Sequence, residues 1–122
     1  MRKLEIGTEK YTQVFAMDEK EFNANHNYVV VPTTSGNETF TEEMLLTSVQ
    51  FQKGPIKENG VNGCCNEDLI AMVIDRLNSF QESPYKCREN ALAITKLEEA
   101  LQWLNWRTRG REKRNVEGTH AV

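Results

Sequence analysis

The sequence predicts an α+β protein in which a small N-terminal antiparallel sheet precedes a C-terminal antiparallel helical hairpin with a long second helix. Short segments rich in Val, Tyr, Phe and Thr occur in the first half of the 122 residues, and such segments favour strands. Residues 54–63 contain three glycines, one proline and two asparagines, which is typical of a turning connector. Beyond the connector, apolar residues recur at helical spacing.

Three segments of the first half are predicted to be strands. They are Lys10 to Met17, Tyr28 to Pro32 and Leu45 to Phe51, and clusters of Gly, Asn and Asp separate them. The segment from Thr41 to Leu46 also fits a single helical turn capped by Thr39 or Thr41. Strand and turn therefore both stay open for that segment.

The first helix is predicted to run from about Glu67 to Phe80. Asn66 is a suitable N-cap, and the acidic Glu67 and Asp68 suit the positive end of the helix dipole. The apolar residues recur with the period of a helix: Leu69, Ile70, Val73, Leu77 and Phe80.

The second helix is predicted to begin with Ser83 as its cap and Pro84 at its first position. The turn between the helices is then short, so the two helices are expected to be antiparallel neighbours. One stripe carries the apolar residues Ala91, Ile94, Leu97, Leu101 and Leu104. At roughly 26 residues this helix spans about 39 Å, against about 21 Å for the first.

Leu92, Trp103 and Trp106 widen the apolar surface of the second helix beyond that stripe. One shorter helix cannot bury so broad a surface, so we expect a second chain to cover it. The sequence therefore predicts a homo-oligomer. The alternative is that the N-terminal half folds over the two tryptophans.

Residues 1–53, 54–65 and 66–122 are expected to form one cooperative unit, because 122 residues are too few for two independent cores. Apolar residues make up 39% of the chain and charged residues 27%, which excludes a disordered tail and a membrane protein. The N-terminus lacks the pattern of a signal peptide, so a cytoplasmic location is expected. A net charge of −3 argues against general binding of DNA or RNA.

No catalytic arrangement is recognisable. His26 lies in a predicted loop and His120 near the end of the chain, and neither has a nucleophile or carboxylate at a usable spacing. The three cysteines, Cys64, Cys65 and Cys87, lack the spacing of metal ligands. Phosphate-loop and dinucleotide-binding motifs are absent from the sequence. We therefore expect no catalytic residue, no metal and no cofactor.

Two segments are candidates for binding phosphates. Arg107 to Arg114 holds five basic residues in eight positions, more than the helix dipole needs, and guanidinium groups match phosphate oxygens in pairs. Arg107, Arg109 and Arg114 are the predicted ligands there, with dipole compensation as the alternative. In the connector, Lys57 and Asn62 are the predicted ligands, and a simple turn is the alternative.

Longer motifs carry a resemblance to a known family. They are Phe51-Gln-Lys-Gly-Pro-Ile-Lys-Glu-Asn-Gly-Val-Asn-Gly63, Asn66-Glu-Asp-Leu, Asp75-Arg-Leu, Phe80-Gln, Arg88-Glu-Asn-Ala, Lys96-Leu-Glu-Glu-Ala-Leu-Gln-Trp-Leu, Arg107-Thr, Arg111, Arg114 and Val116-Glu-Gly-Thr-His. Together they resemble the first Thoeris anti-defence family of phages, whose helical hairpin is shared with anti-CBASS cyclic-oligonucleotide sponges. The related hairpins often carry a small or hydroxyl residue after Asn-Gly, where this chain has Cys64 and Cys65.

The resemblance implies a non-catalytic, oligomeric sponge in the cytoplasm of the infected bacterium. Its ligands would be cyclic ADP-ribose isomers made by Thoeris TIR enzymes and, at a separate site, cyclic di- or trinucleotides. The resemblance places the main pocket at Phe80 and Asn90, which the residues alone would rather explain as a cap over the core and its solvated neighbour. A protein-binding adaptor and a small nucleotide hydrolase are the competing functions.

Overall fold

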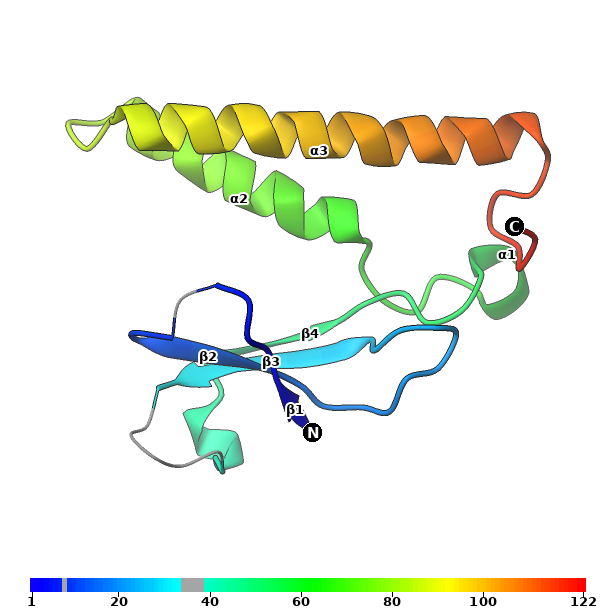
Figure 1. The fold of residues 1–122 in the computed structure, drawn as a ribbon, viewed down its shortest axis with the longest axis horizontal. Coiled ribbons are helices and arrows are strands. Elements are labelled where there is room, and N and C mark those ends of the chain that lie inside the picture. Colours follow the sequence, from blue (N-terminus) through cyan, green and yellow to red (C-terminus); the bar gives the residue numbers. More distant parts are fainter. Residues whose placement is uncertain (8, 34–38) are drawn as a thin grey trace. The chain divides into compact units, whose positions relative to one another are not determined.

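The computed structural model describes residues 1–7, 9–33 and 39–122. The elements are β1 (Arg2–Lys3), β2 (Thr12–Ala16), β3 (Asn27–Pro32), the 3₁₀ turn η1 (Glu42–Met44), β4 (Thr47–Gln50), α1 (Ile56–Asn59), α2 (Asn66–Gln81) and α3 (Arg88–Lys113) (Figure 1). The α+β fold predicted from the sequence is confirmed. Contacts divide the chain into two compact units, Met1–Cys64 and Cys65–Val122.

The first unit is built on a four-stranded antiparallel sheet with the strand order β1-β2-β3-β4. Phe15 of β2 pairs with Val29 of β3, and both side chains are buried together with Val31. Phe40 and Leu45 pack against this cluster from the segment before β4. The small core of the unit therefore lies on one face of the sheet.

The predicted strands exist, but β2 and β4 are shorter than predicted, β3 begins one residue earlier at Asn27, and β1 was not predicted. A strand of two residues carries no alternation that a sequence pattern can reveal. The segment from Thr41 to Leu46 forms a turn rather than a strand, with Thr41 as the N-cap of η1. The Met44 N–H donates to the Thr41 carbonyl oxygen at a distance of 3.0 Å.

The connector is an ordered part of the first unit. The Cys64 N–H donates to the Gln50 carbonyl oxygen (2.9 Å), and the Gln52 N–H donates to the Cys64 carbonyl oxygen (2.8 Å). Gly63 lies so close to the backbone of Phe51 that a Cβ atom there would overlap the Phe51 carbonyl group. The glycine is thus required by the close approach of two backbone segments.

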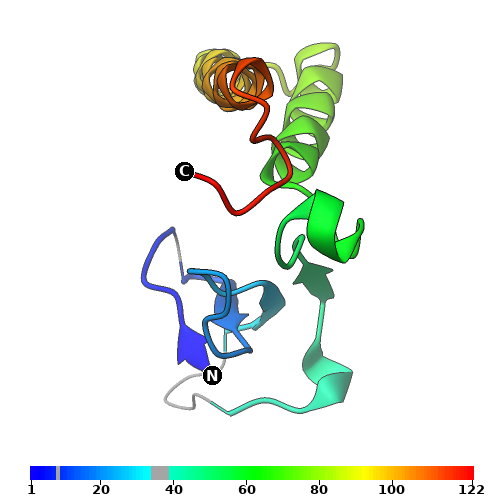
Figure 2. The same ribbon diagram turned by 90° about the vertical axis from the view of Figure 1, so that its right-hand side faces the viewer.

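The second unit is the predicted antiparallel hairpin of α2 and α3, and α3 is seen nearly end-on in Figure 2. The N-cap of α2 is Cys65 rather than Asn66, and the Asp68 carboxylate accepts the Cys65 N–H (2.8 Å). Helix α3 begins at Arg88, capped by Cys87, so the predicted start at Ser83 and Pro84 is wrong.

A local hydrogen-bond pattern explains the later start of α3. The Ser83 hydroxyl donates to the Phe80 carbonyl oxygen (2.6 Å) and accepts the Tyr85 N–H (3.1 Å). Ser83 therefore closes the end of α2 instead of opening α3. Residues 82–87 form the turn between the helices, and α3 has the 26 residues that the sequence predicted.

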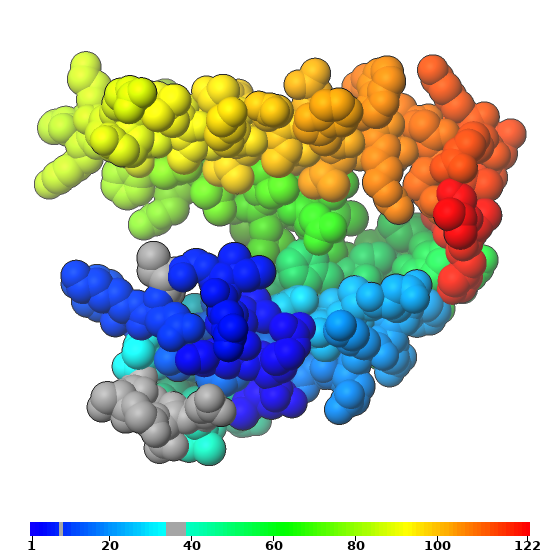
Figure 3. Space-filling model, in the orientation of Figure 1, coloured from blue at the N-terminus to red at the C-terminus, as the bar shows by residue number. Residues whose placement is uncertain are grey.

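Neither helix of the hairpin contains a fully buried residue. Trp103 and Trp106 are each 65% exposed and Leu92 is 47% exposed. The side chains of α3 stand out along its whole length in the space-filling view (Figure 3). This exposed apolar surface is what a second chain would cover, so oligomerisation stays a prediction with a physical basis.

The loop between β2 and β3 is organised by Asp18. Its carboxylate accepts the backbone N–H groups of His26 (3.0 Å) and Asn27 (3.2 Å). His26 itself is buried, and its Nε2 donates to the Glu21 carbonyl oxygen at a distance of 2.6 Å. The loop histidine thus has a structural partner.

The Asp18 contacts predict a pH-dependent stability. Burial raises the pKa of the Asp18 carboxyl group, but the hydrogen bonds from His26, Asn27 and Asn25 outweigh it, so the pKa lies below its ordinary value of 3.8. A lowered pKa stabilises the fold above pH 3.8, and the stabilisation is lost as the pH falls through the folded-state value. We expect Asp18→Asn to lower the unfolding temperature at pH 7. Thermal unfolding across a pH series tests this, and a deficit that does not shrink below pH 3.8 would contradict it.

Candidate ligand-binding site

Phe80 and Asn90 lie on either side of the hairpin turn, in the last turn of α2 and the first turn of α3. The side-chain amide of Gln81 joins the two helix ends. Its nitrogen donates to the Cys87 carbonyl oxygen and its oxygen accepts the Cys87 N–H, each at a distance of 3.0 Å. Cys87 Sγ in turn accepts the Asn90 N–H (3.4 Å). A chain of polar contacts therefore fixes the turn between the two predicted site residues.

The Phe80 ring is partly open to solvent, with 37% of the residue exposed. The guanidinium carbon of Arg76 lies over this ring, 5.2 Å from its centroid. Asn90 is half-buried, and its backbone N–H is already bonded to Cys87. The turn thus offers a flat apolar ring and an amide side chain that can both donate and accept hydrogen bonds.

The predicted basic site is at the other end of α3, where the arginines differ in what they contact. Within the described ranges, the Arg107 and Arg109 side chains have no hydrogen bond or ion pair, and both are exposed. Arg114 donates to the Val122 carbonyl oxygen (3.0 Å). Arg107 and Arg109 are therefore the two predicted ligands whose guanidinium groups are available to an anion.

The end of α3 is closed by a Schellman motif. The Val116 N–H donates to the Arg111 carbonyl oxygen and the Asn115 N–H to that of Glu112, each at a distance of 3.0 Å. Asn115 adopts the left-handed conformation that this motif requires (φ 58°). Arg111 also donates to the carbonyl oxygens of Val116 (3.0 Å) and Thr119 (3.1 Å). Part of the basic segment thus holds the C-terminal residues against the helix end.

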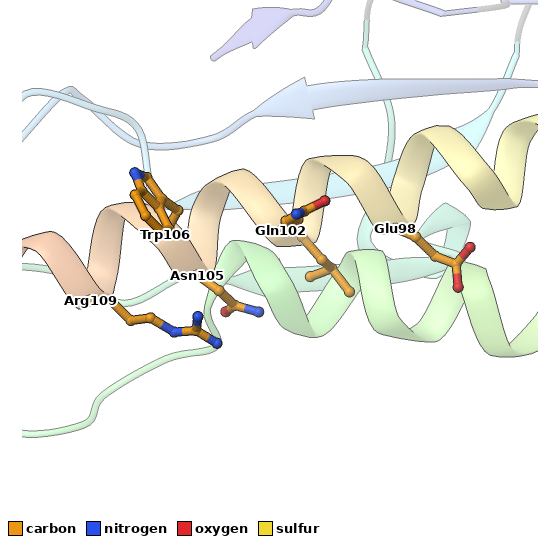
Figure 4. Close-up of a pocket in the computed structure, with 6 residues that line it drawn as sticks. Glu98, Gln102, Asn105, Trp106 and Arg109 are labelled. Atoms are coloured by element: carbon orange, nitrogen blue, oxygen red, sulfur yellow. The ribbon is translucent and has the colours of Figure 1, made fainter.

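An open hollow of about 400 Å³ lies along one face of α3. Its lining consists of Glu98, Leu101, Gln102, Asn105, Trp106 and Arg109. Asn105 and Arg109 point to the same side of the helix, and Trp106 points to the other (Figure 4). The hollow therefore combines an acid, a base, two amides and an indole on one helix.

The two candidate sites are far apart within one chain. Asn90 and Arg109 are both on α3, and a helix rises about 1.5 Å per residue, which separates them by about 28 Å along its axis. One small ligand cannot contact both within one chain.

In the connector, the side chain of Asn62 is already engaged. Its oxygen accepts the Lys53 N–H and its nitrogen donates to the Lys53 carbonyl oxygen, each at a distance of 2.8 Å. Lys57 is exposed on α1, in the same connector. The contacts of Asn62 and the tight packing of Gly63 account for this segment as a structured turn, the alternative that the sequence left open.

Sequence reasoning missed several residues that shape these sites. Gln81 has no spacing that marks it as a clamp, since its partner is a backbone group six residues away. Glu98, Gln102 and Asn105 share the face of Arg109, and their helical spacing was the available signal. Arg76 is one turn before Phe80, a spacing that predicts contact between the two side chains.

Two further observations bear on the class of site. No group of three His, Cys, Asp or Glu side chains is arranged to hold a metal ion anywhere in residues 1–7, 9–33 and 39–122. In that same part of the chain, no helix has both the length and the apolar character needed to span a bilayer.

Comparison with known proteins identifies the family. The family model described as "Acb2/Tad1, hairpin domain" matches residues 47–109, which span β4, the connector, α2 and most of α3. A relative named "Thoeris anti-defense 1", from Bacillus phage SBSphiJ7, is 51% identical in an alignment that covers 98% of this chain and 99% of the relative. The family model matches half of the chain, and the relative aligns with almost all of it. The chain therefore belongs to the Acb2/Tad1 hairpin family, as a Thoeris anti-defence protein.

Proposed function

We propose that this protein is a phage anti-defence sponge, which binds and sequesters cyclic ADP-ribose isomers made by Thoeris TIR enzymes in the infected cell. The relative named for Thoeris anti-defence supports the role. The geometry at the hairpin turn is the observation that supports this class of ligand. There, an open aromatic ring and an amide are held on adjoining helix ends by the Gln81 clamp.

The chemistry of the turn suits a nucleotide. An adenine stacks on an aromatic ring, and the Asn90 amide can bond a ribose hydroxyl or a base edge. Neither group is a nucleophile or a general acid or base, so the site binds without cleaving. A sponge needs sub-micromolar affinity, about 8 kcal/mol of binding free energy or more.

For cyclic di- and trinucleotides we propose a second site around Arg107 and Arg109. Their guanidinium groups are exposed, and those of Arg111 and Arg114 are partly used by the C-terminal residues. The planar guanidinium group pairs with phosphate oxygens in two parallel hydrogen bonds, so these two side chains suit the phosphates of a cyclic oligonucleotide.

Assembly is proposed to occur through α3, whose hollowed face is self-complementary in an antiparallel pairing. Glu98 and Arg109 each lie about 8 Å along the helix axis from the point midway between Trp103 and Leu104. Gln102 and Asn105 each lie about 2 Å from the same point. A two-fold axis at this midpoint places Glu98 opposite the second chain's Arg109, and Gln102 opposite its Asn105.

Recovery of the ligand tests the proposed function against both competitors. The full chain is mixed with the cyclic ADP-ribose isomer purified from a Thoeris TIR reaction, freed of unbound nucleotide, and denatured by heat. A sponge releases the intact isomer, in proportion to the protein. A cleaved product would support the hydrolase, and no bound nucleotide at all would support the protein-binding adaptor.

A further inference from the structure

Helix α2 carries a single basic residue, Arg76, against the three acids Glu67, Asp68 and Asp75. This one cation lies over the Phe80 ring, with its guanidinium carbon 5.2 Å from the ring centroid. Within the described residues, the Arg76 side chain has no hydrogen bond and no ion pair, and its one polar interaction is this cation–π contact with the ring. The five guanidinium N–H donors are therefore still available.

The surroundings of Arg76 on α2 leave its charge uncompensated. Side chains three or four residues away on a helix are neighbours, and those of Arg76 are Met72, Val73, Ser79 and Phe80. None of them is a carboxylate. Arg76 is thus an unneutralised cation over the aromatic ring that the proposed function assigns to a nucleobase.

We propose that Arg76 is the phosphate-binding residue of the Phe80 site. This inference rests on the proposed function, because it needs a base to stack on Phe80. Arg76 and Phe80 are one helical turn apart, about 6 Å along the axis, and the guanidinium group already reaches the ring. A pyrophosphate linked through ribose to the stacked base lies within reach of its donors. The planar guanidinium group then pairs with phosphate oxygens while its carbon stem stays against the ring.

The consequence is selectivity for nucleotides over nucleosides. Stacking on Phe80 alone does not distinguish a base with phosphates from a base without them, whereas Arg76 adds an attraction that only the phosphates feel. Because Arg76 is exposed, this attraction is screened by salt. Binding through Arg76 is therefore expected to weaken with ionic strength.

Calorimetry with the purified cyclic ADP-ribose isomer tests the proposal on wild type, Arg76→Gln and Arg76→Lys. We expect Arg76→Gln to bind at least tenfold more weakly at low salt, and the gap to wild type to narrow as NaCl is raised. Arg76→Lys keeps the charge but not the planar fork, so its affinity should be intermediate. Lys96→Gln, which removes an exposed cation from α3, should match wild type.

The outcomes separate this inference from the proposed function. If wild type binds, Phe80→Ala loses binding and Arg76→Gln keeps wild-type affinity at low salt, the role of Arg76 is overturned and the sponge stands. If wild type itself binds no nucleotide, both fail. A gap that is the same at every salt concentration would also overturn the phosphate contact. Thermal unfolding of each variant checks its fold. If Arg76→Gln melts early, Arg76→Lys decides the question. A moderately reduced affinity that depends on salt as in wild type supports the phosphate contact, and a salt-independent loss of affinity overturns it.

Discussion

Phe80→Ala and Asn90→Ala are each expected to lose capture of the cyclic ADP-ribose isomer while the protein stays folded. Stacking of one base on an aromatic side chain contributes about 1 to 3 kcal/mol, so removing the ring should weaken binding tenfold or more. Loss of the Asn90 amide removes hydrogen bonds of about 1 kcal/mol each and leaves a buried ligand group unsatisfied. Calorimetry gives the dissociation constants, and thermal unfolding gives the stability.

The exposure of Phe80 is what keeps this experiment interpretable. A buried phenylalanine costs about 3 to 5 kcal/mol when cut to alanine, but Phe80 is 37% exposed and makes no part of a closed core. Tyr11→Ala is the matched control, because Tyr11 is an exposed aromatic in the first unit with Lys10 over its ring, 5.2 Å from the centroid. Asn78→Ala controls for the amide, being exposed on α2.

Two results would count against this site. Tight binding by Phe80→Ala would place the pocket elsewhere in the chain. Early melting of either variant would restore a structural explanation of that residue.

The helices were more predictable than their caps, for a physical reason. The apolar period of α2 and α3 runs over several turns, so it determined α2 to within one residue at each end and identified α3 as the longer helix. A cap depends on the backbone angles of one residue and on which groups it bonds. Ser83 has the composition of an N-cap, but its hydroxyl bonds backward to Phe80, so the rule selected the wrong helix end.

The candidate sites were predictable only as far as resemblance and composition reach. Phe80 and Asn90 came from the motifs of the family, since an aromatic residue and an amide near a turn have ordinary structural explanations. The Gln81 clamp follows from the path of the turn, which no periodicity encodes. The same limit applies to the arginines, because the path of the C-terminal residues decides that Arg111 and Arg114 are partly used while Arg109 is not.

Charge reversal on α3 should control assembly. If Glu98 faces the second chain's Arg109, then Glu98→Arg places two cations together, and the two-fold axis repeats that clash. An exposed ion pair contributes about 0.2 to 1 kcal/mol, so replacing two attractions by two repulsions should cost about 2 kcal/mol and raise the dissociation constant of the pairing at least tenfold. Arg109→Glu should do the same by bringing two anions together. Light scattering over a dilution series measures the effect.

The double variant Glu98→Arg, Arg109→Glu separates the two roles proposed for Arg109. Swapping the charges restores the opposite pairs, so assembly should return towards wild type. Binding of a cyclic trinucleotide should stay lost, because a carboxylate now occupies the position of the guanidinium group that pairs with phosphate. Arg109→Ala, which removes the guanidinium group without adding a like charge, should also lose the trinucleotide. If the double variant assembles no better than either single variant, the antiparallel pairing of α3 is wrong. If it assembles and still binds the trinucleotide, Arg109 contributes to the interface alone.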